Sequence, residues 1–491
     1  PTVPDVTYVS CHIASRHDKD TVYASFDNHK NGDFKPYALR SRDRGHTWES
    51  IVGDLPEREI VYSIAEDHEN ADLLFAGTEF GVYFTVDGGA HWIRLKGGIP
   101  TIAVRDIDIQ RRENDLVLAT FGRGFYILDN YAPLRTLSEE ALEADVVLFP
   151  VKDAQRYIET SRFSGRSGRG WMGTSYYVAP NPPFGATFTY YLKEKLTTRK
   201  EKRKEAEKKK IEAGESPRVP SLDELRAEDQ EREPQVWLTV KNAAGETVAR
   251  ESGPRDKGIH RVSWNLRYPS TNPTVLKSPD ERPDWDVDPV GYIAVPGEYT
   301  VTLAKEVDGE WTQLGDPQTF KVVPLELATF AAKNRDEVLA FQAKSARLHR
   351  AVTGAQRVVG EAETRIAHLR KALMDTPGAD PAAIAELDAI DKELTDIKTK
   401  LNGDSTLGRR EEATPYSISD RVSMLVYGQW FVTSPPTKTK MDAYRYAGEE
   451  FAPVLADLRS LVEKDLTAFE AKLESAGAPW TPGRIPDWNM E

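Results

Sequence analysis

The chain has 491 residues and a mass of 55.1 kDa, a length typical of about three domains. Its 65 Lys and Arg are outnumbered by 78 Asp and Glu, and the net charge of −13 argues against a general binder of nucleic acid or anionic membranes. No apolar run is long enough to cross a bilayer. The single cysteine, Cys11, excludes an intrachain disulfide and a cysteine-based zinc site.

An internal repeat occupies residues 1–133. Residues 61–83 and 104–126 align at an offset of 43 and share identical Val, Ile, Asp, Leu, Ala, Gly and Tyr positions, and an earlier copy starts near His12. Each copy has several short alternating runs, and such units of about four strands predict β-propeller blades. Three blades cannot close a ring. Because the chain begins at Pro1 without a signal peptide, we expect the remaining blades upstream in a longer precursor or on another chain.

Two copies of the repeat carry the same turn, with the pattern S/T-x-D-x-G-x-x-W of the Asp box of BNR-type repeats. The Asp side chain of such a turn accepts from backbone N–H groups, Gly adopts positive φ, and Trp packs between neighbouring sheets. We therefore expect a structural role, with no part in catalysis, for the residues of the two turns, which are Ser41, Asp43, Gly45 and Trp48 in one and Thr85, Asp87, Gly89 and Trp92 in the other.

Residues 134–327 are predicted to form an immunoglobulin-like β-sandwich. Alternating apolar and polar runs at 184–192, 235–242, 246–251, 260–267, 297–306 and 318–323 indicate short antiparallel strands. Trp264 and Tyr299 are the expected core aromatics. A charged insertion at 193–233 is basic in its first half and acidic in its second. It is interpreted as a self-neutralising helical hairpin, with a site for an anionic partner as the alternative.

Residues 328–491 change to a helical period. Apolar residues recur at alternating spacings of four and three from Phe341 to Leu373, and a second stripe runs from Ile384 to Leu401. Phe451, Leu458, Leu461, Val462, Phe469 and Leu473 mark a last helix. The expected architecture is an antiparallel, coiled-coil-like helical bundle with an apolar core and no cofactor site.

Taken together, these segments resemble the C-terminal half of the large bacterial sortilin/VPS10-type BNR-repeat proteins, a family often labelled glycosyl hydrolases. The resemblance implies a secreted, periplasmic or cell-surface protein of about twice this length. Phe121 stands where the family often has His, which puts any imidazole role there in doubt. The matching segments are GTEFGVYFTVDGGAHW (77–92), 99–129, NPPFGATFTYYLKE (181–194), PSLDELRAED (220–229), GIHRVSWNLRYP (258–269), VPGEYTVTLAK (295–305) and GAPWTPGRIP (477–486).

The innermost propeller strands would present side chains to the central channel, and they direct the search for chemistry. Glycoside hydrolysis needs two carboxyl groups about 5–10 Å apart, and Glu79 and Asp106 are the candidate catalytic carboxylates. Tyr62, Arg105 and Arg123 are candidate ligand-binding residues of the channel. The competing interpretation is that Arg105, Asp106 and Arg123 form ion pairs between blades.

No metal or cofactor site is predicted. Asp27 to Asp33 begins like an EF-hand calcium loop, but Ala38 occupies the twelfth position where Glu is required. Two functions remain. The first is an exported binding or scaffold protein whose propeller rim recognises a protein, peptide or glycan. The alternative is a glycoside hydrolase whose active site lies in the propeller channel, largely on upstream blades.

Overall fold

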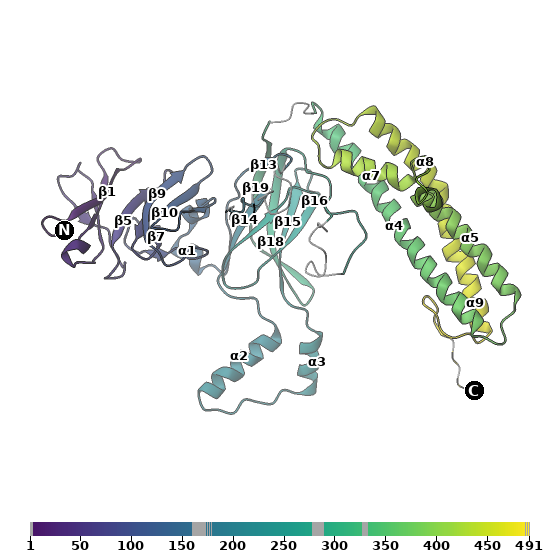
Figure 1. Ribbon diagram of the computed structural model, residues 1–491. Coiled ribbons are helices and arrows are strands. Elements are labelled where there is room, and N and C mark those ends of the chain that lie inside the picture. The colour runs from purple at the N-terminus through teal and green to yellow at the C-terminus, as the bar shows by residue number, and fades with distance from the viewer. Residues whose placement is uncertain are drawn as a thin grey trace.

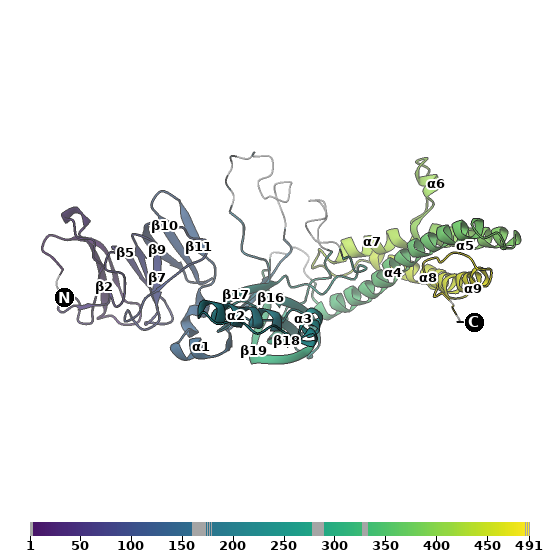
Figure 2. The same cartoon turned by 90° about the horizontal axis from the view of Figure 1, so that it is seen from below.

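The computed structural model describes residues 3–159, 173, 175, 177, 179–276, 289–326, 332–486, 488 and 490. It is elongated: three small sheets at one end, then two further sheets, then helices follow one another in chain order (Figures 1 and 2). The expected mixed class, with β structure first and C-terminal helices after it, is confirmed.

The first three sheets are antiparallel, and their strands pair in chain order. The third sheet has three strands in the described part of the chain, not the expected four, because the chain turns away after β11. The strands of the first sheet are β1 (Tyr8–Ala14), β2 (Val22–Asp27), β3 (Tyr37–Ser41) and β4 (Glu49–Ser50); those of the second are β5 (Val61–Glu66), β6 (Leu74–Thr78), β7 (Val82–Thr85) and β8 (Ile93–Arg94); those of the third are β9 (Val104–Gln110), β10 (Asp115–Thr120) and β11 (Phe125–Leu128).

The second sheet is buried on both faces, whereas the first and third each pack on it with one face. Tyr23 and Ala38 of the first sheet pack against Ile64 and Ala76 of the second. On the opposite face, Phe75 packs with side chains of the third sheet such as Leu116 and Leu118. All six residues of β5 are buried, including Ser63 and Glu66, because this sheet is covered on both faces.

The chain leaves the third sheet through a buried polar anchor. The Tyr131 hydroxyl donates to Asp67 Oδ1 at 2.6 Å, and Arg135 of the 3₁₀ turn η2 (Ala132–Thr136) donates to both carboxylate oxygens at 2.8 Å. Burial alone would raise the pKa of Asp67, but the hydrogen bonds from Arg135 and Tyr131 hold it below the usual value. This anchor fixes where the repeat region ends.

Two further sheets share one apolar core in the middle of the molecule. Trp264 and Tyr299 lie in that core with ring centroids 5.4 Å apart, which confirms their predicted burial. One sheet has the order β12 (Val146–Leu148), β14 (Ala186–Leu192), β17 (Gly258–Trp264); the other has the order β13 (Ala154–Arg156), β19 (Glu310–Pro324), β18 (Gly297–Val307), β15 (Gln235–Asn242), β16 (Thr247–Gly253). The short strands β12 and β13 and the short helix α1 (Glu139–Glu143) were not predicted.

The charged insertion forms two helices, α2 (Arg199–Glu212) and α3 (Leu222–Gln230), that project away from these sheets (Figure 1). Neither helix buries a residue, and both begin with a capping box. Arg203 joins the two helices through paired hydrogen bonds of 2.5 and 2.7 Å to Glu228. The opposite charges of the two halves therefore face one another, as the self-neutralising interpretation expects.

The helices of the C-terminal region enclose one long apolar core. The predicted four-three stripe, from Phe341 to Leu373, lies along the 40-residue helix α4 and is buried or half-buried throughout. The helices are α4 (Arg335–Met374), α5 (Ala382–Asn402), α6 (Ser405–Gly408), α7 (Ile418–Gln429), α8 (Lys438–Ser460) and α9 (Thr467–Ser475). In the described part of the chain, no helix is both long and apolar enough to cross a membrane.

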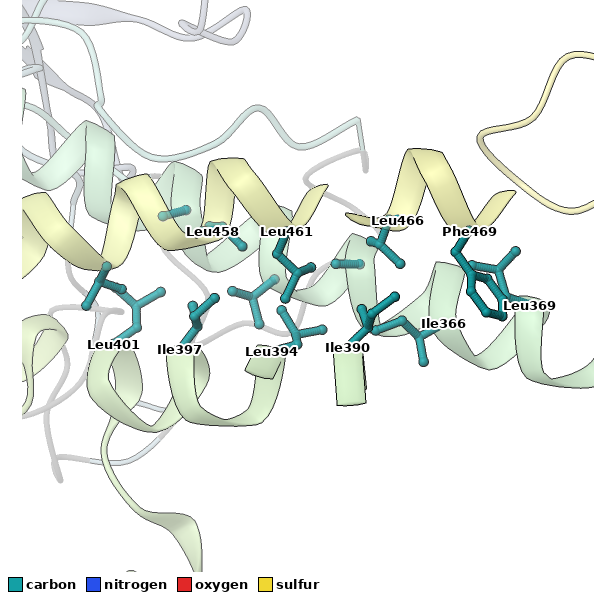
Figure 3. Close-up of a cluster of buried hydrophobic side chains, with 14 of the residues drawn as sticks. Ile366, Leu369, Ile390, Leu394, Ile397, Leu401, Leu458, Leu461, Leu466 and Phe469 are labelled. Atoms are coloured by element: carbon teal, nitrogen blue, oxygen red, sulfur yellow. The ribbon is translucent and has the colours of Figure 1, made fainter. Parts of the chain in front are cut away.

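The last predicted helix is interrupted by a π-helical segment, η4 (Leu461–Leu466). A π turn adds one residue per turn, so it shifts the apolar spacing from four to five. Leu461 and Leu466 are both buried as a result, and Figure 3 shows them beside Leu394 and Ile390 of α5. The sequence stripe included Val462 and omitted Leu466, because a regular helix was assumed.

Candidate functional site

The candidate site begins with a β-bulge that recurs in the first strand of each N-terminal sheet. The pairing of β1, β5 and β9 with the next strand skips one residue, which is Ser10, Tyr62 and Arg105 respectively. These three strands contact one another in order along the molecule. A bulged residue has no partner in the ladder, and its side chain is turned away from the regular alternation. Tyr62 and Arg105 therefore occupy the same bulge position on two strands that contact one another.

Arg105 lies flat against two aromatic rings. Its guanidinium carbon is 3.8 Å from the ring centroid of Tyr62 and 5.4 Å from that of Phe121. The same backbone hydrogen bond occurs in the second and third sheets, between the residue after the second strand and the residue before the first strand. Glu79 N–H donates to Ile60 O at 3.0 Å, and Phe121 N–H donates to Ala103 O at 2.9 Å. Phe121 is exposed, so the stack is open to a ligand on that side.

Carboxylates surround the Tyr62 ring. Burial is the main reason that the pKa of Tyr62 is raised; Arg105 lowers it, and Asp27, Glu79 and Glu59 raise it further. Glu59 is buried and accepts from the Thr78 hydroxyl and from the Phe80 N–H. Glu79 Oε2 is buried and accepts no hydrogen bond within the described residues. The site is therefore acidic apart from Arg105.

The structure brings Tyr62, Arg105 and Glu79 together but leaves two predicted residues outside the cluster. Burial is the main reason that the pKa of the Cys11 thiol is raised, and the charge of Asp106 also raises it. The Asp106 carboxylate accepts from the Ile107 N–H at 2.9 Å. Arg123 is exposed. Among the described residues, Arg105, Asp106 and Arg123 form no ion pair, and their pairing with further blades stays a prediction. Arg105 instead packs its guanidinium group against the rings of Tyr62 and Phe121.

The two polar turns have the same internal hydrogen bonds. In the first, Gly45 N–H donates to Ser41 Oγ at 2.7 Å and Thr47 N–H to Asp43 Oδ1 at 2.7 Å. The Thr47 hydroxyl and backbone hydrogen bonds lower the pKa of Asp43 to about 2.

The second turn repeats this pattern 44 residues on. Gly89 N–H donates to Thr85 Oγ1 at 3.0 Å, and Ala90 and His91 N–H both donate to Asp87 Oδ1 at 3.0 Å. Gly45 and Gly89 have φ values of 90° and 102°, the left-handed region that favours glycine. All of these residues serve the backbone of their own turn.

The tryptophans of the two turns differ. Trp92 is buried between the first and second sheets, where its indole N–H donates to Ile51 O at 2.9 Å. Trp48 is half-buried on the outer face of the first sheet and donates to Gly45 O of its own turn at 3.0 Å. Trp92 is covered by the first sheet, whereas the described residues include no sheet before the first one that could cover Trp48.

Sequence reasoning missed Glu59 and the bulges. Glu59 lies in a loop with no repeat partner, and a bulge leaves no mark on apolar alternation over so short a strand. One signal was present in the sequence. A threonine precedes a glycine by three residues at Thr78 and Gly81 and by four at Thr120 and Gly124, and in both copies the threonine hydroxyl donates to the glycine carbonyl. Within the described residues, no group of His, Cys, Asp and Glu is arranged to hold a metal ion.

Comparison with known proteins gives structural neighbours only, since no family model and no curated protein matches the chain. An ancestral GH74 enzyme is 17% identical over 38% of this chain and 26% of that chain, with a TM-score of 0.22. The GH74 enzyme of Niastella koreensis is 11% identical over 62% of this chain and 38% of that one, with a TM-score of 0.22. PorZ, a bacterial surface component of the type-IX secretion system of Porphyromonas gingivalis, is 15% identical over 64% of this chain and 38% of its own, with a TM-score of 0.21.

The chain spans only 26% to 38% of the length of these neighbours. TM-scores this low do not establish a shared fold. Any function must therefore be argued from the side chains of this chain itself.

Proposed function

We propose that the chain is an exported binding and scaffold protein of the sortilin/VPS10-like, BNR-repeat kind. Residues 1–133 would be consecutive blades of a β-propeller, 134–327 an immunoglobulin-like domain with the 193–233 hairpin, and 328–491 a helical bundle. The observation that carries the proposal is the bulge repeated in β1, β5 and β9, which sets Tyr62 and Arg105 side by side at the ends of neighbouring blades. The two matching turns support their assignment as Asp boxes.

The outer faces of the first and third sheets support the expectation of further blades. Phe125 and Ile127 of β11 are 75% and 60% exposed, and Tyr8 and Val9 of β1 are exposed as well. Exposed apolar faces of this kind mark surfaces that another element covers. We infer that additional four-stranded sheets, from the same precursor or another chain, pack on both.

The ligand of the proposed site would be a glycan or a peptide. Exposed aromatic and guanidinium faces stack on apolar sugar faces or on side chains, and carboxylates accept from hydroxyl or ammonium groups. The test is binding of the chain to a panel of neutral oligosaccharides and of lysine-containing peptides. Arg105→Met should lower the affinity at least about tenfold for whichever class binds, a loss of about 1.4 kcal/mol. Arg123→Met, an exposed arginine outside the cluster, is the matched control. Equal binding by Arg105→Met and Arg123→Met would overturn the site.

The alternative is a glycoside hydrolase. The raised pKa of Tyr62 opposes a nucleophilic role for its hydroxyl, since an activated nucleophile needs a lowered pKa or an adjacent base. In the described structure Glu79 acts on Tyr62, whereas Asp106 acts on the Cys11 thiol and accepts from the Ile107 N–H. Turnover of a glycan by the full-length precursor that is lost in Glu79→Gln or Asp106→Asn would establish the enzyme and defeat the binding-only proposal.

A further inference from the structure

The junction between the two middle sheets and the helices contains a buried arginine without a partner. Arg156 is the last residue of β13 and is 9% exposed. Among the described residues, its Nε has no hydrogen-bond partner and no carboxylate forms an ion pair with its guanidinium. Removing a charged group from water is costly unless an opposite charge or hydrogen bonds replace the water. The position therefore calls for an anion.

Two more arginines gather at the same place. Burial first, and then the positive charges of Arg335 and Arg267, lower the pKa of Arg156 to about 10, against an opposing effect of Tyr299. Arg156 is still charged at neutral pH. Arg335 is the exposed first residue of α4, whose N-terminal end carries a partial positive charge. The guanidinium groups of three separate segments therefore act electrostatically on one another at this junction.

Arg267 ties this cluster to the helices. Its Nη1 donates to Gly291 O at 3.0 Å and to Trp430 O at 2.9 Å, just beyond the end of α7. Trp430 is itself buried, and its indole N–H has no acceptor among the described residues. The only carboxylate of the described chain that acts on Arg267 is Glu159, which is exposed. Buried donors without an acceptor among the described residues therefore remain at this junction, on Arg156 and Trp430.

We propose that this junction is an anion site that binds an oxyanion group, carboxylate or phosphate, with Arg156 as its buried donor and Arg267 and Arg335 at its edge. Guanidinium groups bind planar carboxylates and phosphates through paired N–H bonds, which a chloride ion does not reproduce. A bound oxyanion would link β13, the segment after β17 and the start of α4. It would then stabilise the contact between the sheets and the helices, independently of the ligand site proposed at Tyr62.

The experiment is thermal unfolding of the whole chain in inorganic phosphate, in succinate and in sodium chloride at equal ionic strength. The unfolding temperature of the wild type should rise in a saturable way in phosphate or succinate beyond its change in chloride, because a ligand that binds only the folded state stabilises it. The salt that acts identifies the source of the oxyanion. Arg156→Met should abolish the rise and should unfold in chloride at the same temperature as the wild type or higher, since it removes an uncompensated charge.

Two further variants keep the result decisive. Arg335→Met changes an exposed residue, should fold normally, and should weaken the response. Arg261→Met is the control that keeps it, because the Arg261 guanidinium already donates to the carbonyls of Asp129 and Asn130, each at 2.6 Å. The proposal is overturned if the wild type responds to phosphate and succinate no more than to chloride. It is equally overturned if Arg156→Met responds like the wild type, or if that variant is destabilised in chloride.

Discussion

The N-terminal sheets and the C-terminal helices are held together by different chemistry. The strands of the sheets are two to seven residues long, so many backbone groups fall in turns, and carboxylates such as the buried Asp67 and the exposed Asp87 accept from them. The helices satisfy their own backbone and bury a continuous apolar seam instead. Short repeated strands therefore depend on polar turn residues, whereas long helices depend on side-chain volume.

The largest effect is expected from truncating the helical seam. Phe469 of α9 is fully buried beside Leu369, and Phe469→Ala should lower the free energy of unfolding of the helical region by about 4 kcal/mol, because the lost transfer energy adds to the cost of the cavity. Chemical denaturation followed by circular dichroism at a helical wavelength measures it. Ile384→Ala, at a half-exposed position of α5, is the control. Equal losses in both variants would contradict a seam-dependent core.

The next largest loss of stability is expected from removing a polar anchor of the N-terminal sheets. Asp67→Ala removes the buried acceptor for Tyr131 and Arg135 and leaves a mostly buried guanidinium with the exposed Glu69 as its carboxylate partner, so we expect a loss of about 3 kcal/mol. Glu69→Ala is the matched control, because Glu69 also contacts Arg135 at 2.8 Å but is exposed and should cost less than about 1 kcal/mol. Thermal unfolding of the sheets, followed by tryptophan fluorescence, compares them. A control as damaging as Asp67→Ala would contradict the buried anchor.

A smaller effect with a pH signature is expected at the second turn. Burial acts to raise the pKa of Asp87, but hydrogen bonds from Thr85 and His91 outweigh it and lower the pKa from 3.8 to about 2. A lowered pKa contributes stability that is complete above the unfolded value and is lost as the pH falls through the folded value. Asp87→Asn should therefore be less stable than the wild type by about 1–2 kcal/mol at pH 7. The difference should shrink between about pH 4 and pH 2. A difference independent of pH would contradict a role for the charge.

The smallest effect is expected from the projecting hairpin. Neither α2 nor α3 buries a residue, and Arg199 N–H donates to Glu231 at 2.7 Å where the two arms meet. Replacing residues 200–229 by a short Gly-Ser linker should leave the unfolding temperature of the rest of the chain unchanged. Calorimetry of the shortened chain measures this, and a clear drop would show that the hairpin supports the sheets beneath it.

Much of the fold was accessible to sequence reasoning, because its signals are local. The 43-residue repeat, the turns at Asp43 and Asp87 and the helical stripe of α4 each depend on residues close together in the chain. The π-helical segment was not accessible, since Leu466 becomes buried only through one additional residue in the turn. The hydrogen bond from Tyr131 to the distant Asp67, which anchors the exit from the third sheet, was not accessible either.

The candidate site divides in the same way. By itself, the sequence determined which residues the first strands carry, and so it named Tyr62, Arg105 and Glu79. Only the tertiary structure decided that bulges set Tyr62 against Arg105, that Glu59 acts on the same ring, and that Asp106 acts on Cys11. The convergence of Arg156, Arg267 and Arg335 is likewise invisible along the chain. Its physical cause is that burial and charge repulsion are set by neighbours in space, which lie more than 60 residues apart in sequence.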